Sequence, residues 1–384
     1  DIRLCPPIDH RAALVDGWAQ ADIVITSYDL LRRDEKLYAG QNFYACILDE
    51  AQAIKNHTTQ KYKAVCGVNS KVRFALTGTP VENRLGELWS IFSFLMPGYL
   101  PPYKSFCSRF EKPIVQEEDQ TAVRRLNQLT GPFILRRMKS DVLKELPPKT
   151  ENVYRIELEE EQRKLYLAAV VDARDKLQAA KPEDKMAVFA VLMRLREICC
   201  DPRLVADNWD GGSAKLDACM ELVTAAVEGG HRILLFSQFT SMLELLAKRL
   251  DEAGVSHFTL QGSTPKPVRA EQVRRFNQGE ADVFLISLRA GGTGLNLTAA
   301  DIVIHYDPWW NLAAQNQATD RAYRIGQRNP VQVYRLIAQD TIEEKIVELQ
   351  QAKQSLADTV TGGADGAILS MNPEQLLQLL GEEA

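Results

Sequence analysis

The sequence predicts an α/β protein built on parallel β-sheets. Short runs rich in Ile, Val, Leu and Phe recur between helical patterns, which is typical of strands buried on both faces of a parallel sheet. These runs form two groups that lie far apart in the chain. We expect strands near residues 22–26, 45–48 and 72–76, and then near residues 233–236, 255–260, 283–287, 302–306 and 331–337. The pattern therefore predicts one α/β unit followed by another.

Two stretches without a strand signal, residues 91–135 and 159–204, lie between the groups. A proline-marked segment at residues 146–149 separates them and is the candidate interdomain linker. In the second stretch one helix face is apolar, which indicates packing rather than a site. Its members are Val188, Leu192, Leu195 and Cys199, with Arg194, Arg196 and Glu197 expected mostly elsewhere on the helix.

Length and composition fit a folded chain of two or three domains. The 384 residues are 45% hydrophobic and 25% charged, which is ordinary for globular proteins. The formal net charge of −5 indicates no polyanionic partner by itself, and no apolar run approaches the roughly 18 residues of a membrane helix. The seven cysteines include no Cys-x-x-Cys pair, so the sequence supports neither a zinc site nor an extracellular disulfide framework.

A predicted strand ends in two carboxylates, Asp49 and Glu50. Ligands of open α/β sheets bind at the carboxyl ends of the strands, so this pair could work on a bound ligand. Asp49 could hold a metal-bound water near nucleotide phosphates, and Glu50 could orient or deprotonate the attacking water. The alternative is that two acidic residues simply end a strand in solvent, which an isolated Asp-Glu pair would favour.

The turn after the next strand carries two hydroxyl groups, in Leu76-Thr77-Gly78-Thr79-Pro80. Such a turn can hydrogen-bond to carboxylates and sense whether a phosphate is present, although an ordinary Gly/Pro loop would look similar. In the second group, residues 287–297 form a glycine-rich loop after a strand, and its amides could meet phosphates.

Two arginines, Arg321 and Arg324, lie three residues apart within the segment from Gln317 to Gln327, on one side of a helix or turn. A guanidinium group is always charged and binds two oxygens, which suits charge developing on a transferred phosphoryl group. Surface salt bridges to Asp320 and nearby acids are the alternative.

Taken in order, these segments resemble the Swi/Snf-type DNA-dependent ATPases of helicase superfamily two. The matching segments are residues 23–28 (motif Ib), 49–52 (the DEAH-type motif II), 76–80 with Asn83 (motif III), 235–239 (motif IV), 262–264 with Arg269, 287–297 (motif V) and 317–327 (motif VI). Residues 133–142 and 198–202 are similar to segments special to this family, unlike general RNA helicases.

The resemblance implies two recombinase-like, parallel-sheet lobes of the P-loop NTPase type with helical insertions, the first lobe being incomplete. It implies an ATP-dependent translocase on double-stranded DNA that uses ATP and Mg²⁺ and moves or strips bound proteins. DNA-bound proteins or RNA polymerase are the expected partners, in addition to DNA. We expect a monomer with no membrane partner, in the cytoplasm and on the nucleoid if the source is bacterial.

The resemblance also divides the chain into four parts. These are residues 1–135 (lobe one, with an insertion at about 91–135), 136–150 (interlobe linker), 151–350 (lobe two, with an insertion at about 159–204) and 351–384 (a flexible tail and a short terminal helix).

Site residues follow from the resemblance in three classes. Asp49, Glu50, Arg321 and Arg324 are expected to be catalytic, with Asp49 also holding the metal. Nucleotide contacts are expected from Thr77, Gly78, Thr79, Gly292, Gly294, Gln317 and Asp320. DNA contacts are expected from Thr26, Ser27, Arg269, Ser287, Arg289 and Trp310. For Trp310, a place in the core remains the alternative to stacking on a base.

One family motif is not in the printed sequence. The chain contains no Gly-x-x-x-x-Gly-Lys-Ser/Thr phosphate loop, which should precede motif Ib. We therefore interpret Asp1 as an internal point of a longer protein and expect the isolated chain to hydrolyse ATP negligibly. The alternative function is a non-hydrolysing DNA or protein interaction module that keeps the motor fold.

Overall fold

A computed structural model describes residues 2–4, 18, 21–78, 85–117, 119–137, 143, 145–179, 181, 184–206, 208–288, 295–350, 374, 376–377 and 380. The chain divides into two compact units, here called unit 1 (mainly residues 1–135) and unit 2 (mainly residues 136–353). No helix among the described residues is long and apolar enough to cross a membrane.

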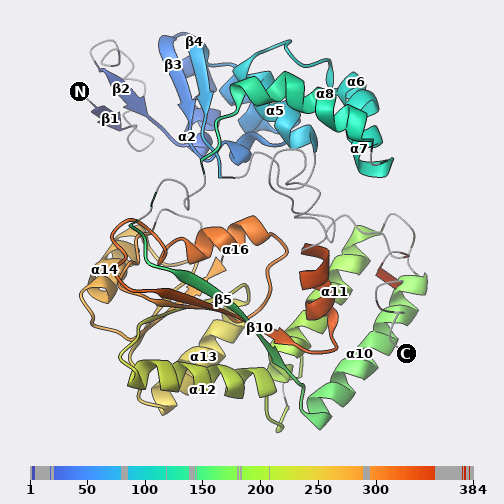
Figure 1. The fold of residues 1–384 in the computed structure, drawn as a ribbon, viewed down its shortest axis with the longest axis vertical. Helices are drawn as coiled ribbons and strands as arrows, with labels where there is room; N and C mark the ends of the chain where they lie inside the picture. Colours follow the sequence, from blue (N-terminus) through green and yellow to red (C-terminus); the bar gives the residue numbers. More distant parts are fainter. Residues whose placement is uncertain are drawn as a thin grey trace. The chain divides into compact units, whose positions relative to one another are not determined.

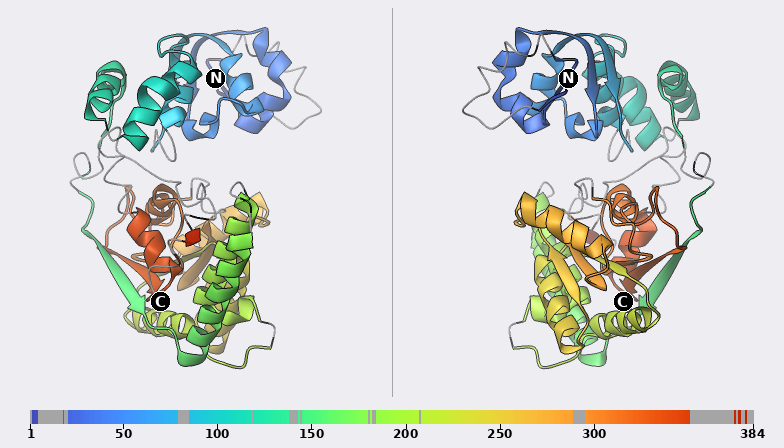
Figure 2. Two further views of the ribbon diagram at one scale, coloured as in Figure 1. Left: turned by 90° about the vertical axis from the view of Figure 1, so that its right-hand side faces the viewer. Right: turned by 90° about the vertical axis from the view of Figure 1, so that its left-hand side faces the viewer.

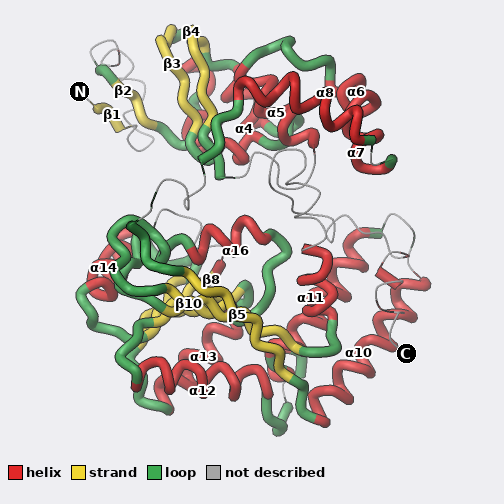
Figure 3. The backbone as a smooth tube through the Cα atoms, in the orientation of Figure 1, coloured by secondary structure: helices red, strands yellow, loops and turns green. Residues whose placement is uncertain are grey.

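Unit 1 contains two pairs of parallel strands followed by a helical region (Figure 3). The strands are β1 (Ile2–Leu4) with β2 (Ile23–Ile25), and β3 (Asn42–Leu48) with β4 (Asn69–Ala75). The helices between the strands are α2 (Tyr28–Arg33), α3 (Glu35–Ala39), the 3₁₀ helix η2 (Ala51–Ile54) and α4 (Gln60–Cys66).

The helical region of unit 1 has a core of its own. Its elements are α5 (Leu85–Leu95), α6 (Tyr103–Phe106), the π-helix η3 (Cys107–Glu111), α7 (Lys112–Gln116), α8 (Gln120–Thr130) and the 3₁₀ helix η4 (Gly131–Phe133). Leu88, Phe92, Phe106 and Leu126 from these helices are buried against one another. Apart from the turns between these helices, the described residues of the stretch 91–135 are helical, and they contain no strand, in agreement with the missing strand signal.

One face of the β3–β4 pair is apolar and exposed. Ile47 and Phe74 are paired across the strands, and both are more than half exposed. Strands of parallel sheets are normally buried on both faces, so this face is available to a further layer of protein.

Unit 2 is built on a parallel six-stranded sheet in the order β5-β10-β9-β6-β8-β7 (Figure 1). The strands are β5 (Lys149–Ile156), β6 (Ile233–Ser237), β7 (His257–Leu260), β8 (Val283–Ser287), β9 (Ile302–His305) and β10 (Val331–Ala338). Every residue of β6, β8 and β9 is buried, which explains why their sequences read as continuous apolar runs.

Helices cover both faces of this sheet because successive side chains of a strand point to opposite faces. Leu235 faces α12 (Ala214–Glu228) and α13 (Thr240–Glu252) in one core cluster. Leu234 faces α14 (Lys266–Asn277) and α16 (Leu312–Thr319) in the other, as Figure 1 shows.

A helical pair stands beside the sheet. Helices α10 (Glu160–Ala179) and α11 (Lys185–Cys200) lie side by side, followed by the short 3₁₀ helix η5 (Pro202–Leu204) (Figures 1 and 2). The predicted apolar stripe of α11 is confirmed, because Val188, Leu192, Leu195 and Cys199 are all buried in one cluster with α10.

Each strand predicted from the sequence is present, with ends shifted by at most a few residues. The strand β5 was not predicted, and it begins inside the segment assigned to the linker. It lies at the sheet edge, pairs only with β10, and among its residues only Ile156 is buried. Because an edge strand can be polar, Lys149, Thr150 and Glu151 gave no strand signal.

A buried ion pair joins α12 to the end of the sheet. Lys215 of α12 donates to Glu343, and both side chains are fully buried. Glu343 Oε2 also accepts from the backbone N–H of Ala338 at 2.8 Å. Burial alone would lower the pKa of Lys215, but the charge and hydrogen bond of Glu343, together with the neighbouring Cys200 and Cys199, raise it.

Lys215→Met should therefore lower the free energy of unfolding by about 3–5 kcal/mol, because it leaves a buried carboxylate without its cation. Urea denaturation followed by circular dichroism measures this. The double variant Lys215→Met/Glu343→Met should recover part of the loss, since no uncompensated charge remains. A single variant within about 1 kcal/mol of the parent would contradict the assignment.

Candidate functional site

The carboxyl ends of β3 and β4 bring two predicted site segments together in unit 1. Asp49 and Glu50 follow β3, and Thr77 and Gly78 follow β4. The backbone N–H of Leu76 donates to the carbonyl of Leu48 at 2.7 Å, and that of Ala51 donates to the carbonyl of Leu76 at 2.9 Å. The two segments therefore have a fixed register relative to each other.

Glu50 has an uncommon backbone conformation. Its φ of 49° and ψ of 53° lie in the left-handed region, which non-glycine residues seldom adopt. This conformation turns the chain from β3 directly into the 3₁₀ helix η2. Backbone strain of this kind is frequent at functional sites.

A side-chain relay connects Glu50 to the turn after β4. Gln52 Nε2 donates to Glu50 Oε2 at 2.6 Å, and Thr77 Oγ1 donates to Gln52 Oε1 at 2.8 Å. The sequence predicted that the Thr77 hydroxyl could meet a carboxylate, and in the structure the Gln52 amide stands between them. Gln52 was not among the predicted site residues, although its place two residues after Glu50 in the quoted motif was the available signal.

The Asp49 side chain is exposed, and a hydrogen bond from a neighbouring side chain holds its backbone. Its Oδ1 accepts from the backbone N–H of Glu50 at 3.0 Å, and its carbonyl accepts from the Tyr28 hydroxyl at 2.7 Å. Burial, and then the charge of Asp49, raise the pKa of Tyr28 to about 12, so this hydroxyl remains a donor at neutral pH.

This arrangement fits a magnesium ion that is carried by a phosphate ligand. Among the described residues no group of three or more His, Cys, Asp and Glu side chains could hold a metal. Mg²⁺ is usually bound by one or two carboxylates together with substrate phosphates and water, and the exposed carboxylates of Asp49 and Glu50 offer such a set.

The two predicted arginines of unit 2 differ in exposure. Helix α16 ends at Thr319, so Arg321 and Arg324 lie in the turns that follow it. Arg321 is only 7% exposed, and its carbonyl accepts from the backbone N–H of Leu297 at 3.0 Å, whereas Arg324 is exposed. Gln317 and Asp320 are half-buried on α16 and at its C-cap.

Two buried polar side chains hold this arginine segment. Gln327 Nε2 donates to the carbonyls of Ala300 and Ala322, at 2.7 and 3.2 Å. His305 of β9 lies with its Nε2 2.9 Å from Thr319 Oγ1, at the end of α16. Burial, with smaller contributions from Arg335 and Lys149, lowers the pKa of His305 to about 3, so the imidazole is neutral.

The predicted DNA contacts have different environments. The Ser27 side chain accepts from the backbone N–H of Leu30 as the N-cap of α2, while Thr26 and Arg269 are half-buried. Ser287 is 3% exposed at the end of β8. Trp310 is 8% exposed, and the Arg196 guanidinium lies 4.3 Å from the centre of its ring, so a base could stack there only by displacing Arg196.

Several predicted residues lie outside the described part of the chain. These are Thr79, Asn83, Arg289, Gly292 and Gly294.

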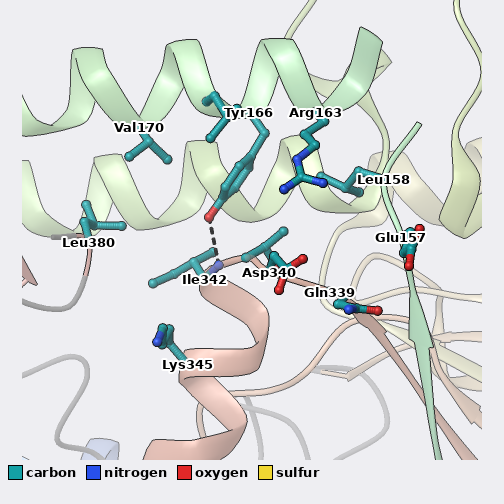
Figure 4. A pocket seen from close by; sticks show the side chains of 12 residues that line it. Glu157, Leu158, Arg163, Tyr166, Val170, Gln339, Asp340, Ile342, Lys345 and Leu380 are labelled. Carbon is teal, nitrogen blue, oxygen red and sulfur yellow. Dashed lines mark hydrogen bonds between the residues drawn. The ribbon is translucent and has the colours of Figure 1, made fainter. Parts of the chain in front are cut away.

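A small cavity in unit 2 is not a nucleotide site. It has a volume of about 140 Å³ and lies between α10, the ends of β5 and β10, and Leu380 (Figure 4). Tyr166 accepts there from the backbone N–H of Ile342 at 2.8 Å. Ligand pockets usually have roughly 300–1,000 Å³, and no predicted site residue lines this one.

Comparison with known proteins identifies the class. The family model described as the SNF2-related domain matches residues 14–204, and that of the helicase conserved C-terminal domain matches residues 214–326. The chain therefore combines an SNF2-related domain with a helicase C-terminal domain.

The solved SWI2/SNF2 ATPase core of Sulfolobus solfataricus in complex with dsDNA is 33% identical, with a TM-score of 0.51. That match covers 98% of this chain and 80% of the other. The chain belongs to the SWI2/SNF2 family, which confirms the resemblance and the fold inferred from the sequence.

Curated relatives are much longer than this chain. An uncharacterized ATP-dependent helicase of Mycoplasma pneumoniae is 40% identical over 93% of the chain and 34% of its own length. The mouse SWI/SNF-related matrix-associated actin-dependent regulator of chromatin subfamily A member 1 is 37% identical over 92% of the chain and 35% of its own length. The chain thus spans about a third of these relatives.

The buried imidazole of His305 should make unit 2 sensitive to acid. The pKa of the imidazole is 6.5 in the unfolded chain and about 3 in the folded chain. The contribution of neutral His305 to the free energy of unfolding is therefore fully present above pH 6.5 and is lost as the pH falls toward 3. By pH 5 the loss should be about 2 kcal/mol. Urea denaturation at pH 7.5 and 5.0 measures it. His305→Asn should remove this part of the pH dependence, and an unchanged dependence would contradict the interpretation.

Proposed function

We propose that this protein is the core of an ATP-driven motor that translocates on double-stranded DNA and remodels nucleoprotein complexes. Membership of the SWI2/SNF2 family supports the use of ATP, and the similarity to a core in complex with dsDNA supports duplex DNA as the track. The observation that carries the proposal is the relay from Thr77 through Gln52 to Glu50, which holds a strand-end carboxylate beside a second carboxylate.

The proposed roles follow from the exposure and contacts of each residue. Asp49 holds a magnesium ion, which neutralises phosphate charge when bound with ATP. Glu50 orients and deprotonates the attacking water, because its carboxylate is held by Gln52. Thr77 changes its hydrogen bond with Gln52 when a phosphate is present, and Gly78 and Thr79 are further proposed nucleotide contacts.

The arginine segment of unit 2 supplies positive charge. We propose that Arg321 and Arg324 stabilise the charge on the transferred phosphoryl group, and that Gln317, Asp320, Gly292 and Gly294 contact the nucleotide. Thr26, Ser27, Arg269, Ser287 and Arg289 are the proposed DNA contacts. Trp310 is also a proposed DNA contact, and Arg196 lies against its ring.

Partners beyond DNA are proposed from the family. DNA-bound proteins, including RNA polymerase, are the proposed objects of the motor, which acts as a monomer in the cytoplasm or on the bacterial nucleoid. A non-hydrolysing interaction module is the second candidate, and the specific observation in its favour is the lack of a phosphate-loop sequence in the printed chain.

Glu50→Gln in the full-length protein should abolish DNA-stimulated ATP hydrolysis while ATP binding stays within about threefold. Glutamine keeps the size and the hydrogen bond with Gln52 but cannot accept a proton. Steady-state hydrolysis and fluorescent-nucleotide binding measure the two effects. Retained turnover would contradict the base assignment, and duplex RNA in place of duplex DNA serves as the substrate control.

The isolated 384-residue chain should show negligible ATP hydrolysis with or without duplex DNA, because it contains no loop to hold the phosphates. The same assay on the full-length protein is the control. Robust DNA-stimulated turnover by the isolated chain would refute this expectation.

A further inference from the structure

The loops after β6 and β9 lie side by side in unit 2 and enclose a buried arginine. Strands β6 and β9 pair in parallel, so the residues that follow them meet at one edge of the sheet. Arg196 of α11 reaches between these two loops, and its side chain is fully buried. This contradicts the expectation that Arg196 lies away from the packed face of its helix.

Arg196 holds the segment after β9 through contacts of three kinds. Its Nη2 donates to the carbonyl of Pro308 and lies 3.4 Å from Asp307 Oδ2. The guanidinium lies 4.3 Å from the centre of the Trp310 ring and 5.6 Å from that of Phe239, which follows β6. Its Nε and Nη1 make no hydrogen bond with the described residues, so these contacts alone orient the group.

Asp307 also contacts the residues at the end of β6. Its Oδ1 accepts from the Ser237 hydroxyl at 2.6 Å and from the backbone N–H of Gln238 at 3.2 Å. Burial raises the pKa of Asp307, and the charge of Arg196 opposes that rise. Arg196 and Asp307 thus stabilise each other while joining the helical pair to the ends of β6 and β9.

The segment of residues 307–311, here called the held segment, leads directly into α16 and the arginine segment. Asn311 caps α16, with its Oδ1 accepting from the backbone N–H of Ala314 at 2.7 Å. The backbone N–H of Trp309 donates to Gln315 Oε1 at 3.2 Å, which attaches the held segment to the first turn of the helix. Because α16 is only eight residues long, a shift at its start would reach Arg321 beyond its end.

We propose that Arg196 is a positioning residue that sets the place of α16, and through it of Arg321, for ATP hydrolysis. This rests on the proposed function. The planar guanidinium can hydrogen-bond a carbonyl and stack on a ring at the same time, which a lysine ammonium cannot do. An error of about 1 Å in the placement of a reacting group is enough to cost roughly 100-fold in rate.

The test uses the full-length protein with Arg196→Met and Arg196→Lys. Arg196→Met should lower kcat of DNA-stimulated ATP hydrolysis at least tenfold, with KM for ATP within about twofold, because Arg321 acts on the transition state. Arg196→Lys keeps the charge and should fold normally. It should lose about threefold to tenfold in kcat, because it lacks the planar contacts.

Lys215→Met is the matched control. It also removes a fully buried cation from unit 2, but its ion pair holds α12 to Glu343 rather than to the segment of residues 307–311. At a temperature where circular dichroism shows all variants folded, its kcat should stay within about twofold of the parent. An equal fall of kcat in Lys215→Met would overturn the positioning role, as would an unchanged kcat in both Arg196 variants.

The failure of this inference can be told from the failure of the proposed function. A full-length parent protein without DNA-stimulated hydrolysis overturns the proposed function and the role of Arg196 with it. A parent that hydrolyses ATP, with Arg196→Met and Arg196→Lys at the parental kcat, overturns the role of Arg196 alone.

Discussion

Parallel strand pairing is the constraint on which the candidate chemistry of this protein depends. When strands run in the same direction, all their carboxyl ends meet at one edge of the sheet. In unit 1 this places the residues after β3 and β4 within hydrogen-bonding reach of each other, as the Thr77–Gln52–Glu50 relay shows. In unit 2 the same geometry brings Ser237 at the end of β6 and Asp307 after β9 into contact. Residues that are far apart in sequence thus meet because the strands before them are paired in parallel.

The sequence was informative wherever burial decided the residue types. The strands β6, β8 and β9 are buried at every position and were predicted with nearly correct ends. The strand β5 escaped prediction because its edge position lets it be polar. The other edge strand, β7, was predicted because its residues are at least partly buried, so exposure rather than edge position alone hid β5.

Candidate site residues could be named from the sequence, but most of the contacts between them could not. Asp49 and Glu50 were singled out from their place after a strand, but the amide of Gln52 between Glu50 and Thr77 depends on the strained backbone at Glu50, which no composition signal reports. The helical pattern assigned Arg196, with Arg194 and Glu197, mostly to other parts of the helix surface than the apolar stripe. The burial of Arg196 depends on Asp307 and Trp310, more than a hundred positions later in the chain.

Exposed and buried polar residues have different places in this protein. Asp49, Glu50 and Arg324, which are proposed to meet ligand, are exposed, whereas Arg321 is only 7% exposed. Arg196, Asp307 and His305 of unit 2 are buried, and each takes part in an ion pair, a ring contact or a hydrogen bond. A buried charge is costly unless it is paired, and hydrophobic residues of similar size would often be as stable or more so. What the polar groups add is direction, because a hydrogen bond or a stacked guanidinium fixes an orientation that apolar packing leaves open. We therefore interpret the ionic interior of unit 2 as the means by which a short helix and the arginines after it are kept in one place.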